Sequence, residues 1–256
     1  MQQRNIAELY FSPTGGTKDV SNRAARALAD HSAAYDLTAP ETEGVSFAAD
    51  DIAIVSLPVF AGRIPPIAAD RLRRFSGNGA AALALVVYGN RHYDDALLEL
   101  CDVLRERGFR VAGAAAIVAR HSIAPEIGEG RPDDGDYREI AAFMEAAGER
   151  IASGDLPDAL PLPGNRPYKT TPPGGFPIAV SEACTQCGTC AAHCPVGAIP
   201  LAAPSTTDLD ACIRCMRCIR ICPEQARAVP PEAYAKLQHF LSAFRTPREN
   251  EFFPDV

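Results

Sequence analysis

Apolar and polar residues alternate in blocks over residues 1–155. Short runs that are apolar or β-branched are separated by longer runs with apolar residues at helical spacing. The runs 52–57 and 83–88 are apolar without alternation, which is typical of strands covered on both faces. The expected strands are Ile6–Phe11, Ala34–Leu37, Ile52–Leu57, Ala81–Tyr88 and Val111–Ala119. The expected helices are Lys18–Asp30, Pro66–Arg74, Asp94–Arg107 and Tyr137–Ser153.

Five strands that alternate with helices predict an α/β domain with a doubly wound parallel sheet. Right-handed crossovers place the loops that follow the strands along one edge, where ligands bind at the switch in strand order. Cys101 lies within an apolar helical pattern (Leu97, Leu98, Leu100, Leu104), so we expect it in the core.

The character of the chain changes after residue 155. Residues 156–177 are rich in proline and lack apolar periodicity, which predicts an extended, semi-rigid linker. Residues 178–229 form an internal repeat, because CTQCGTCAAHCPVGAI returns 28 residues later as CIRCMRCIRICPEQAR. In the tail, residues 230–256, we expect a short helix over Glu232–Phe244, followed by a strap or a frayed end.

Eight of the nine cysteines fall within residues 184–222, in two runs of the pattern C-x-x-C-x-x-C-x-x-x-C-P. This is the spacing of a bacterial ferredoxin with two 4Fe–4S clusters, in which the fourth cysteine of each run ligates the other cluster. The pattern does not fit the paired C-x-x-C spacing of zinc sites, and a disulfide framework gives no reason for the repeat. The expected ligand sets are Cys184, Cys187, Cys190 and Cys222 for the first cluster, and Cys212, Cys215, Cys218 and Cys194 for the second.

Charge differs between the two cysteine runs. Positive charge favours the reduced form of a cluster, so we expect the second cluster to have the higher potential. The alternative is that the charged residues of the second run are solvated surface groups. They are Arg214, Arg217 and Arg220, where the first run has Gln186, Thr189 and His193.

A loop rich in glycine and hydroxyl residues, residues 12–17, follows the first strand and opens a helix. Backbone N–H groups, hydroxyl donors and the helix dipole there suit an anion. The spacing matches neither GxxxxGK[ST] nor G-x-G-x-x-G, so a terminal monophosphate fits better than a nucleoside triphosphate or a dinucleotide. The alternative is a capped turn without a ligand.

The segment FSPTGGT is similar to the phosphate loop of flavodoxins, and two later loops match flavodoxins by position. The resemblance implies a flavodoxin-like five-stranded sheet of order 2-1-3-4-5 that binds FMN. It implies that the phosphate contacts Ser12, Thr14, Gly15, Gly16 and Thr17. The ring would lie between the loop Pro58, Val59, Phe60, Ala61 and Gly62 and the loop 88–94, with Phe60 and Tyr93 stacking on it and Gly89 and Asn90 at its edge. The whole chain resembles fusions of a flavodoxin-like domain with a small α+β dicluster ferredoxin domain.

Several polar side chains are expected at the cofactor edge, after the ends of strands. A histidine there, His92 or His121, could donate a proton to a substrate or to the flavin. The alternative is a polar rim without a catalytic role. The other members of this group are Arg63, Arg91 and Ser122.

Composition limits the classes of partner that we expect. A formal net charge of −7 disfavours nucleic-acid binding as the main role and is compatible with a redox protein as partner. The sequence has no run of 18 apolar residues that could span a membrane. The first residues lack the basic and apolar regions of a signal peptide, which predicts a cytoplasmic protein. The sequence leaves the oligomeric state open, a homodimer among the options.

Three functions are compatible with these motifs. The first is an electron carrier that relays electrons between two 4Fe–4S clusters and a bound FMN, and on to a redox partner. The second is an FMN-dependent reductase of a small substrate or a second flavin, with His92 and His121 as the residues to test. The third is a redox-sensing or assembly module whose clusters signal their state to a partner.

Overall fold

The computed structural model describes residues 5–156, 159–170 and 175–254. Its centre is a sheet of order β2-β1-β3-β4-β5-β8, in which the first five strands are parallel. These strands are β1 (Ile6–Tyr10), β2 (Ala33–Asp36), β3 (Ile52–Pro58), β4 (Ala81–Tyr88) and β5 (Arg110–Val118). The order 2-1-3-4-5 is that of the flavodoxin-like fold, as the sequence predicted.

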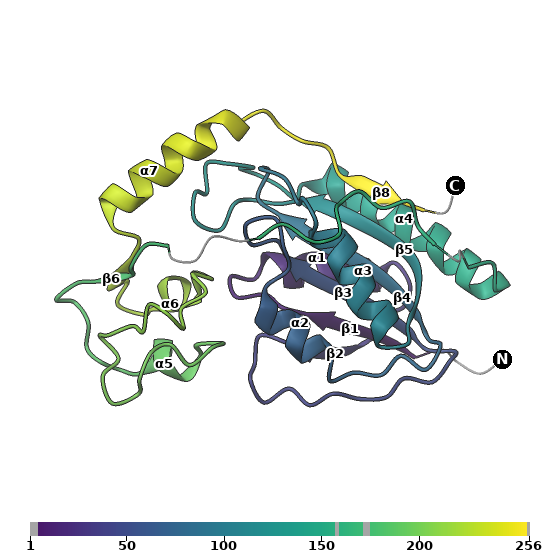
Figure 1. Ribbon diagram of the computed structural model, residues 1–256, viewed down its shortest axis with the longest axis horizontal. Coiled ribbons are helices and arrows are strands. Elements are labelled where there is room, and N and C mark those ends of the chain that lie inside the picture. Colours follow the sequence, from purple (N-terminus) through teal and green to yellow (C-terminus); the bar gives the residue numbers. More distant parts are fainter. Residues whose placement is uncertain (1–4, 157–158, 171–174, 255–256) are drawn as a thin grey trace.

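Helices cover both faces of the sheet, which explains the apolar strands without alternation (Figure 1). On one face, the β-strand residues pack against α2 (Pro66–Leu72) and α3 (Ala96–Glu106), and Cys101 is fully buried there as expected. On the other face lie α1 (Gly16–Arg26) and α4 (Asp134–Ser153). Successive residues of β1, β3, β4 and β5 therefore enter different cores, and both cores demand apolar side chains.

The sheet has a sixth strand that the sequence did not predict. β8 (Glu251–Phe253) pairs antiparallel with β5, so the expectation of five strands is incomplete. The tail before it forms α7 (Pro231–Leu241) and the 3-10 turn η1 (Ser242–Phe244), close to the expected helix. Of the two outcomes considered for the last residues, the tail is a strap that returns to the sheet (Figure 1).

The cysteine-rich part, residues 175–229, lies beside the carboxyl ends of the parallel strands (Figure 1). It contains a two-stranded sheet, β6 (Ala179–Val180) with β7 (Arg227–Ala228), and the short helices α5 (Thr189–Ala192) and α6 (Arg217–Arg220). Each short helix begins after a left-handed residue, Gly188 in the first half and Met216 in the second. The internal repeat in the sequence is thus a repeat in backbone conformation.

Within the described residues, no helix is both long enough and apolar enough to cross a bilayer.

Candidate cofactor and cluster sites

The loop at residues 12–17 has the conformation expected of an anion-binding loop. Gly15 has φ 102°, a left-handed value that favours glycine, and helix α1 begins at the next residue. Ser12 braces the loop, because its N–H donates to Thr38 Oγ1 at 2.7 Å and its Oγ accepts from Lys18 N at 2.9 Å. The loop is thus held in place from both sides.

The donor groups of this loop fit a phosphate. In the described part of the chain, the N–H groups of Thr14, Gly15, Gly16 and Thr17 have no backbone acceptor. A Cβ placed on Gly16 would meet no atom within 4 Å, so the space above the helix N-terminus is open. Free N–H groups at the start of a helix attract anions.

Two cavities meet at this edge of the sheet. The smaller, about 80 Å³, is lined by loop residues that include Thr14, Gly16 and Thr17, and by Pro58, Val59 and Phe60. The larger, about 350 Å³, extends past Val59, Ala61 and Gly62 to α7. Both cavities share Val59, Tyr88, Gly89 and His121, so they adjoin each other at this edge of the sheet.

Three of the residues assigned by resemblance have other contacts. Tyr93 is 1% exposed, its hydroxyl donates to Glu251 at 2.6 Å, and it lines neither cavity, so its stacking on a flavin stays a prediction. Asn90 is also 1% exposed, and its amide donates to the carbonyls of Phe244 and Thr246 instead of facing the site. The Ser12 Oγ is used within the loop and does not line either cavity.

The two candidate histidines differ in position. His121 lines both cavities, and burial lowers its pKa to about 4. His92 lines only the larger cavity, where it stacks on Tyr93 with ring centroids 5.0 Å apart. Arg91 and Lys169, also at the larger cavity, both donate to Asp94. Burial opposes ionisation of Asp94, but the hydrogen bonds from these two cations outweigh it and lower the Asp94 pKa.

The eight cysteines of the two runs gather into two groups around separate cavities. One cavity is lined by Cys184, Cys187, Cys190 and Cys222, and the other by Cys194, Cys212, Cys215 and Cys218. In each group three sulfurs come from one run and the fourth from the other, which is the grouping expected from the sequence. Among the described residues, no three His, Cys, Asp or Glu side chains converge in the way that a single metal ion requires.

The surroundings of these cavities fit anionic iron–sulfur clusters. The buried Nε groups of Arg214, Arg217 and Arg227 lack an acceptor in the described part of the chain, and all three side chains line the cysteine cavities. Burial raises the pKa of the Cys215 thiol to about 12, so this sulfur needs a bound cation to be a thiolate. Backbone N–H groups already point at two sulfurs, since Ala198 N donates to Cys194 Sγ and Ala226 N to Cys222 Sγ, each at 3.3 Å.

Comparison with known proteins agrees with this chemistry. Residues 176–223 match the family described as 4Fe-4S dicluster domain. This region is a 4Fe-4S dicluster domain. No curated protein matches the chain.

Several solved structures are similar to part of the chain. Rubredoxin oxygen:oxidoreductase from Desulfovibrio gigas is 14% identical with a TM-score of 0.42, and the match covers 59% of this chain and 38% of that one. A flavodoxin from Streptococcus pneumoniae TIGR4 is 18% identical with a TM-score of 0.40, covering 58% and 99%. Oxidised Flavodoxin 1 from Bacillus cereus is 13% identical with a TM-score of 0.39, covering 57% and 97%. The flavodoxin-like description of the fold stands on the strand order itself.

The dicluster domain docks directly on the edge of the flavodoxin-like sheet. Cys215, expected to ligate the second cluster, also lines the smaller cavity together with Thr14 and Phe60. The Arg217 guanidinium donates to Pro13 O in the phosphate loop at 3.3 Å. Arg71, 3% exposed, donates to the carbonyl of Pro195, the residue after Cys194. The second cysteine group is therefore the one that faces the smaller cavity, beside residues 12–17.

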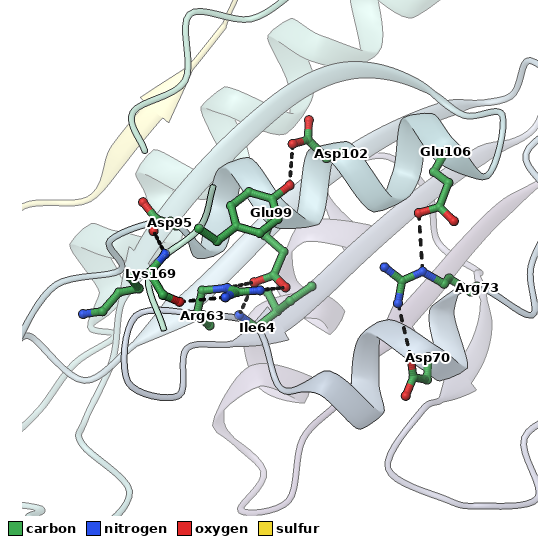
Figure 2. Close-up of polar contacts among 10 residues, drawn as sticks. Arg63, Ile64, Asp70, Arg73, Asp95, Glu99, Asp102, Glu106 and Lys169 are labelled. Atoms are coloured by element: carbon green, nitrogen blue, oxygen red, sulfur yellow. Dashed lines mark hydrogen bonds and ion pairs between the residues drawn. The ribbon is translucent and has the colours of Figure 1, made fainter. Parts of the chain in front are cut away.

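The linker is attached along α3 by ionic and polar contacts (Figure 2). Arg63 pairs with Glu99 through two contacts of 2.6 Å and donates to Lys169 O at 2.8 Å. Lys169 N donates to Asp95 at 2.6 Å, and the Tyr168 hydroxyl donates to Asp102 at 2.5 Å. Arg63, expected at the cofactor rim, thus connects the linker backbone at Lys169 to Glu99 of α3.

Sequence reasoning missed several residues that shape the sites. Leu237, Phe240 and Leu241 of α7 form a wall of the larger cavity, and their spacing on one helix face was the only available signal. Arg227 is 3% exposed and lines the first cysteine cavity, so the first cluster site also has a cation. A comparison of charges within the cysteine runs alone could not find it, because Arg227 lies outside both runs.

Proposed function

We propose that this protein is an electron carrier that relays electrons between two 4Fe–4S clusters and a bound FMN, and on to a redox partner. The observation that carries this proposal is the position of Cys215, which belongs to the second cysteine group and also lines the smaller cavity beside residues 12–17. When bound, FMN accepts one or two electrons, whereas each cluster accepts one.

Separate groups of residues would bind the FMN and each of the two clusters. The N–H groups of residues 14–17 would hold the FMN phosphate, and Val59, Tyr88 and Gly89 would enclose the ring. Cys194, Cys212, Cys215 and Cys218 would hold the cluster next to this cavity. Cys184, Cys187, Cys190 and Cys222 would hold the other cluster, at which Cys187 is exposed. This order makes the first cysteine group the entry point for an outside partner.

Anaerobic purification tests the proposal. We expect about eight irons, eight sulfides and one FMN per chain, since each cluster holds four irons and four sulfides. Zinc in place of iron, or a chain that fails to bind FMN when FMN is added, would contradict it.

The order of the relay needs a second experiment. With reduced ferredoxin as donor, we expect Cys215→Ser to slow reduction of bound FMN at least tenfold while FMN binding persists. Gly15→Val, by contrast, should abolish FMN binding and leave the iron content unchanged, because it forces a β-branched residue into a left-handed conformation.

A reductase is a second candidate, and the larger cavity favours it. Its apolar wall includes Ile123, Leu237 and Phe240, whereas its rim has Arg91 and Lys169, which share the single carboxylate of Asp94. The excess positive charge suits a small organic anion bound against the ring. Turnover of FMN-loaded protein with a panel of aromatic carboxylates and quinones tests this candidate, and a Lys169→Ala variant should raise KM for anionic acceptors only.

A further inference from the structure

The imidazole of His121 is fixed in one orientation between the two cavities. Its Nδ1 accepts hydrogen bonds from the N–H groups of Ile123 at 3.2 Å and Ala124 at 3.1 Å. Its Cδ2 lies 2.5 Å from the position that a Cβ on Gly89 would occupy. The ring therefore lies against the backbone of the loop that follows β4, in space that only glycine leaves open.

These contacts determine which nitrogen carries the proton. A neutral imidazole has one N–H and one acceptor nitrogen, and here Nδ1 is the acceptor of two backbone donors. The proton therefore belongs on Nε2. Burial favours the neutral form, and it lowers the His121 pKa to about 4. Within the described residues, Nε2 has no hydrogen-bond partner.

Three other titratable side chains at the larger cavity already have hydrogen-bond partners, whereas the buried Tyr88 hydroxyl has none among the described residues. Arg91 and Lys169 donate to Asp94, and His92 Nδ1 accepts the Asp94 N–H at 2.8 Å. Of these histidines and cations, His121 alone lines both cavities, where a flavin phosphate and ring would meet.

We propose that His121 donates a hydrogen bond through Nε2–H to an oxygen or nitrogen of the isoalloxazine ring, and that Gly89 provides the space for the imidazole to do so. This inference rests on the proposed binding of FMN. Because reduction adds electron density to the acceptor atoms of the ring, a fixed neutral donor binds the reduced form more strongly than the oxidised form. His121 is thus assigned the role of a donor in flavin binding, and not that of a proton-transferring acid.

Two amide substitutions separate the roles of the two ring nitrogens. Asn at position 121 can accept the backbone N–H groups near Nδ1 but cannot reach the site of Nε2, whereas Gln places an N–H near Nε2. We expect His121→Asn to weaken binding of reduced FMN about tenfold more than binding of oxidised FMN. For a two-electron couple this lowers the midpoint potential by about 30 mV. His121→Gln should restore at least half of that difference.

The experiment measures two quantities on anaerobic, full-length protein with intact clusters. The dissociation constant of oxidised FMN comes from fluorescence quenching, and the midpoint potential comes from spectroelectrochemical titration. Gly89→Ala keeps a φ that any residue can adopt but places its Cβ 2.5 Å from the His121 Cδ2 and 2.8 Å from the His121 Cα, so it should displace His121 and shift the potential in the same direction as His121→Asn.

His92→Asn is the matched control, since His92 also accepts a backbone N–H through Nδ1 in the same cavity. A potential shift with His92→Asn but not with His121→Asn would overturn the inference, as would equal potentials in wild-type protein and His121→Asn. In both cases FMN would still bind, so the proposed function would stand. Wild-type protein that binds no FMN would overturn both.

Discussion

His121 couples the stability of one loop to pH. Its pKa is lowered to about 4 in the folded protein, whereas an exposed histidine has a pKa of about 6.5. Between pH 6.5 and 4, His121 is therefore neutral while the loop is closed and protonated when the loop is open. The stability of the loop is thus complete above pH 6.5 and declines as the pH falls toward 4.

Amide hydrogen exchange at Ile123 and Ala124 tests this dependence, because their N–H groups donate to His121. We expect their protection factors, corrected for intrinsic exchange, to fall up to about tenfold per pH unit between pH 6.5 and 4. In His121→Asn the protection should be lower at pH 7 but nearly constant over this range. Protection in wild-type protein that does not change with pH would contradict the lowered pKa.

At the scale of single residues, the sequence indicated which residues form the motifs more reliably than it indicated which residues are buried. The cysteine groups and the phosphate loop depend on local spacing, which a sequence displays directly. Tyr93 and Asn90 were assigned to the site because of their place after β4. Both are covered by the tail, since Asn90 donates to a carbonyl 154 residues later in the chain. No local pattern reveals such a contact.

At the scale of elements, the linker is held against the sheet domain by polar contacts along α3 and by Leu160, which is buried in the core. Arg63 and Glu99 are 24% and 10% exposed, and together they hold the backbone at Lys169. We expect Glu99→Gln to release this segment and to speed tryptic cleavage after Lys169 severalfold, because the Arg63 side chain loses its charged partner.

Glu106→Gln is the control for this change, because Glu106 lies on the same helix and pairs with Arg73 (Figure 2). That pair is 42% and 55% exposed, and exposed pairs contribute about 0–1 kcal/mol. Cleavage after Lys169 should therefore remain at the wild-type rate. Equal acceleration by both substitutions would contradict a specific role for Glu99.

The tail strap depends on Asn90. Its side chain makes three hydrogen bonds to the backbone of residues 244–248, and each such buried bond contributes about 1 kcal/mol. We expect Asn90→Ala to destabilise the strap by about 2–3 kcal/mol and to raise hydrogen exchange of β8 without raising that of β3. Exchange that is unchanged in β8 would show that its pairing with β5 is sufficient.

Periodicity predicted the long elements and missed the short ones for a physical reason. β1, β3, β4 and β5 and the helices α1 to α4 bury apolar residues in two cores, so their sequences carry a continuous apolar run or a helical period. β8 spans three residues, and its first residue, Glu251, accepts a hydrogen bond from Tyr93. Such a strand depends on its tertiary partners and has no pattern of its own.

For the whole molecule, Arg217 joins the two domains at the point where their sites meet. It lines the second cysteine cavity and donates to Pro13 in the phosphate loop. Removal of its charge should make the second cluster harder to reduce. We expect Arg217→Gln to lower the potential of that cluster by about 59 mV, which corresponds to about 1.4 kcal/mol for one electron.

An EPR-monitored redox titration resolves the two clusters and tests this shift. Arg220→Gln is the control, because Arg220 is exposed on the same short helix. Its effect should be smaller, since solvent screens an exposed charge. Equal shifts in the two variants would indicate a general charge effect. The presence of Arg227 beside the first cluster site means that the relative potentials of the two clusters remain a prediction.

Because the chain returns to the sheet as β8, the dicluster domain is connected to the sheet domain at both of its ends, by the linker before it and by the tail after it. Its position beside the smaller cavity is then set by the fold and needs no diffusive search, so we expect electron transfer from the second cluster to the proposed FMN to follow a single exponential. Cleavage of the linker or of the tail should replace the single exponential with a spread of rates. A tag fused after β8 should also perturb the redox kinetics, although β8 lies far along the chain from every cysteine of the two runs.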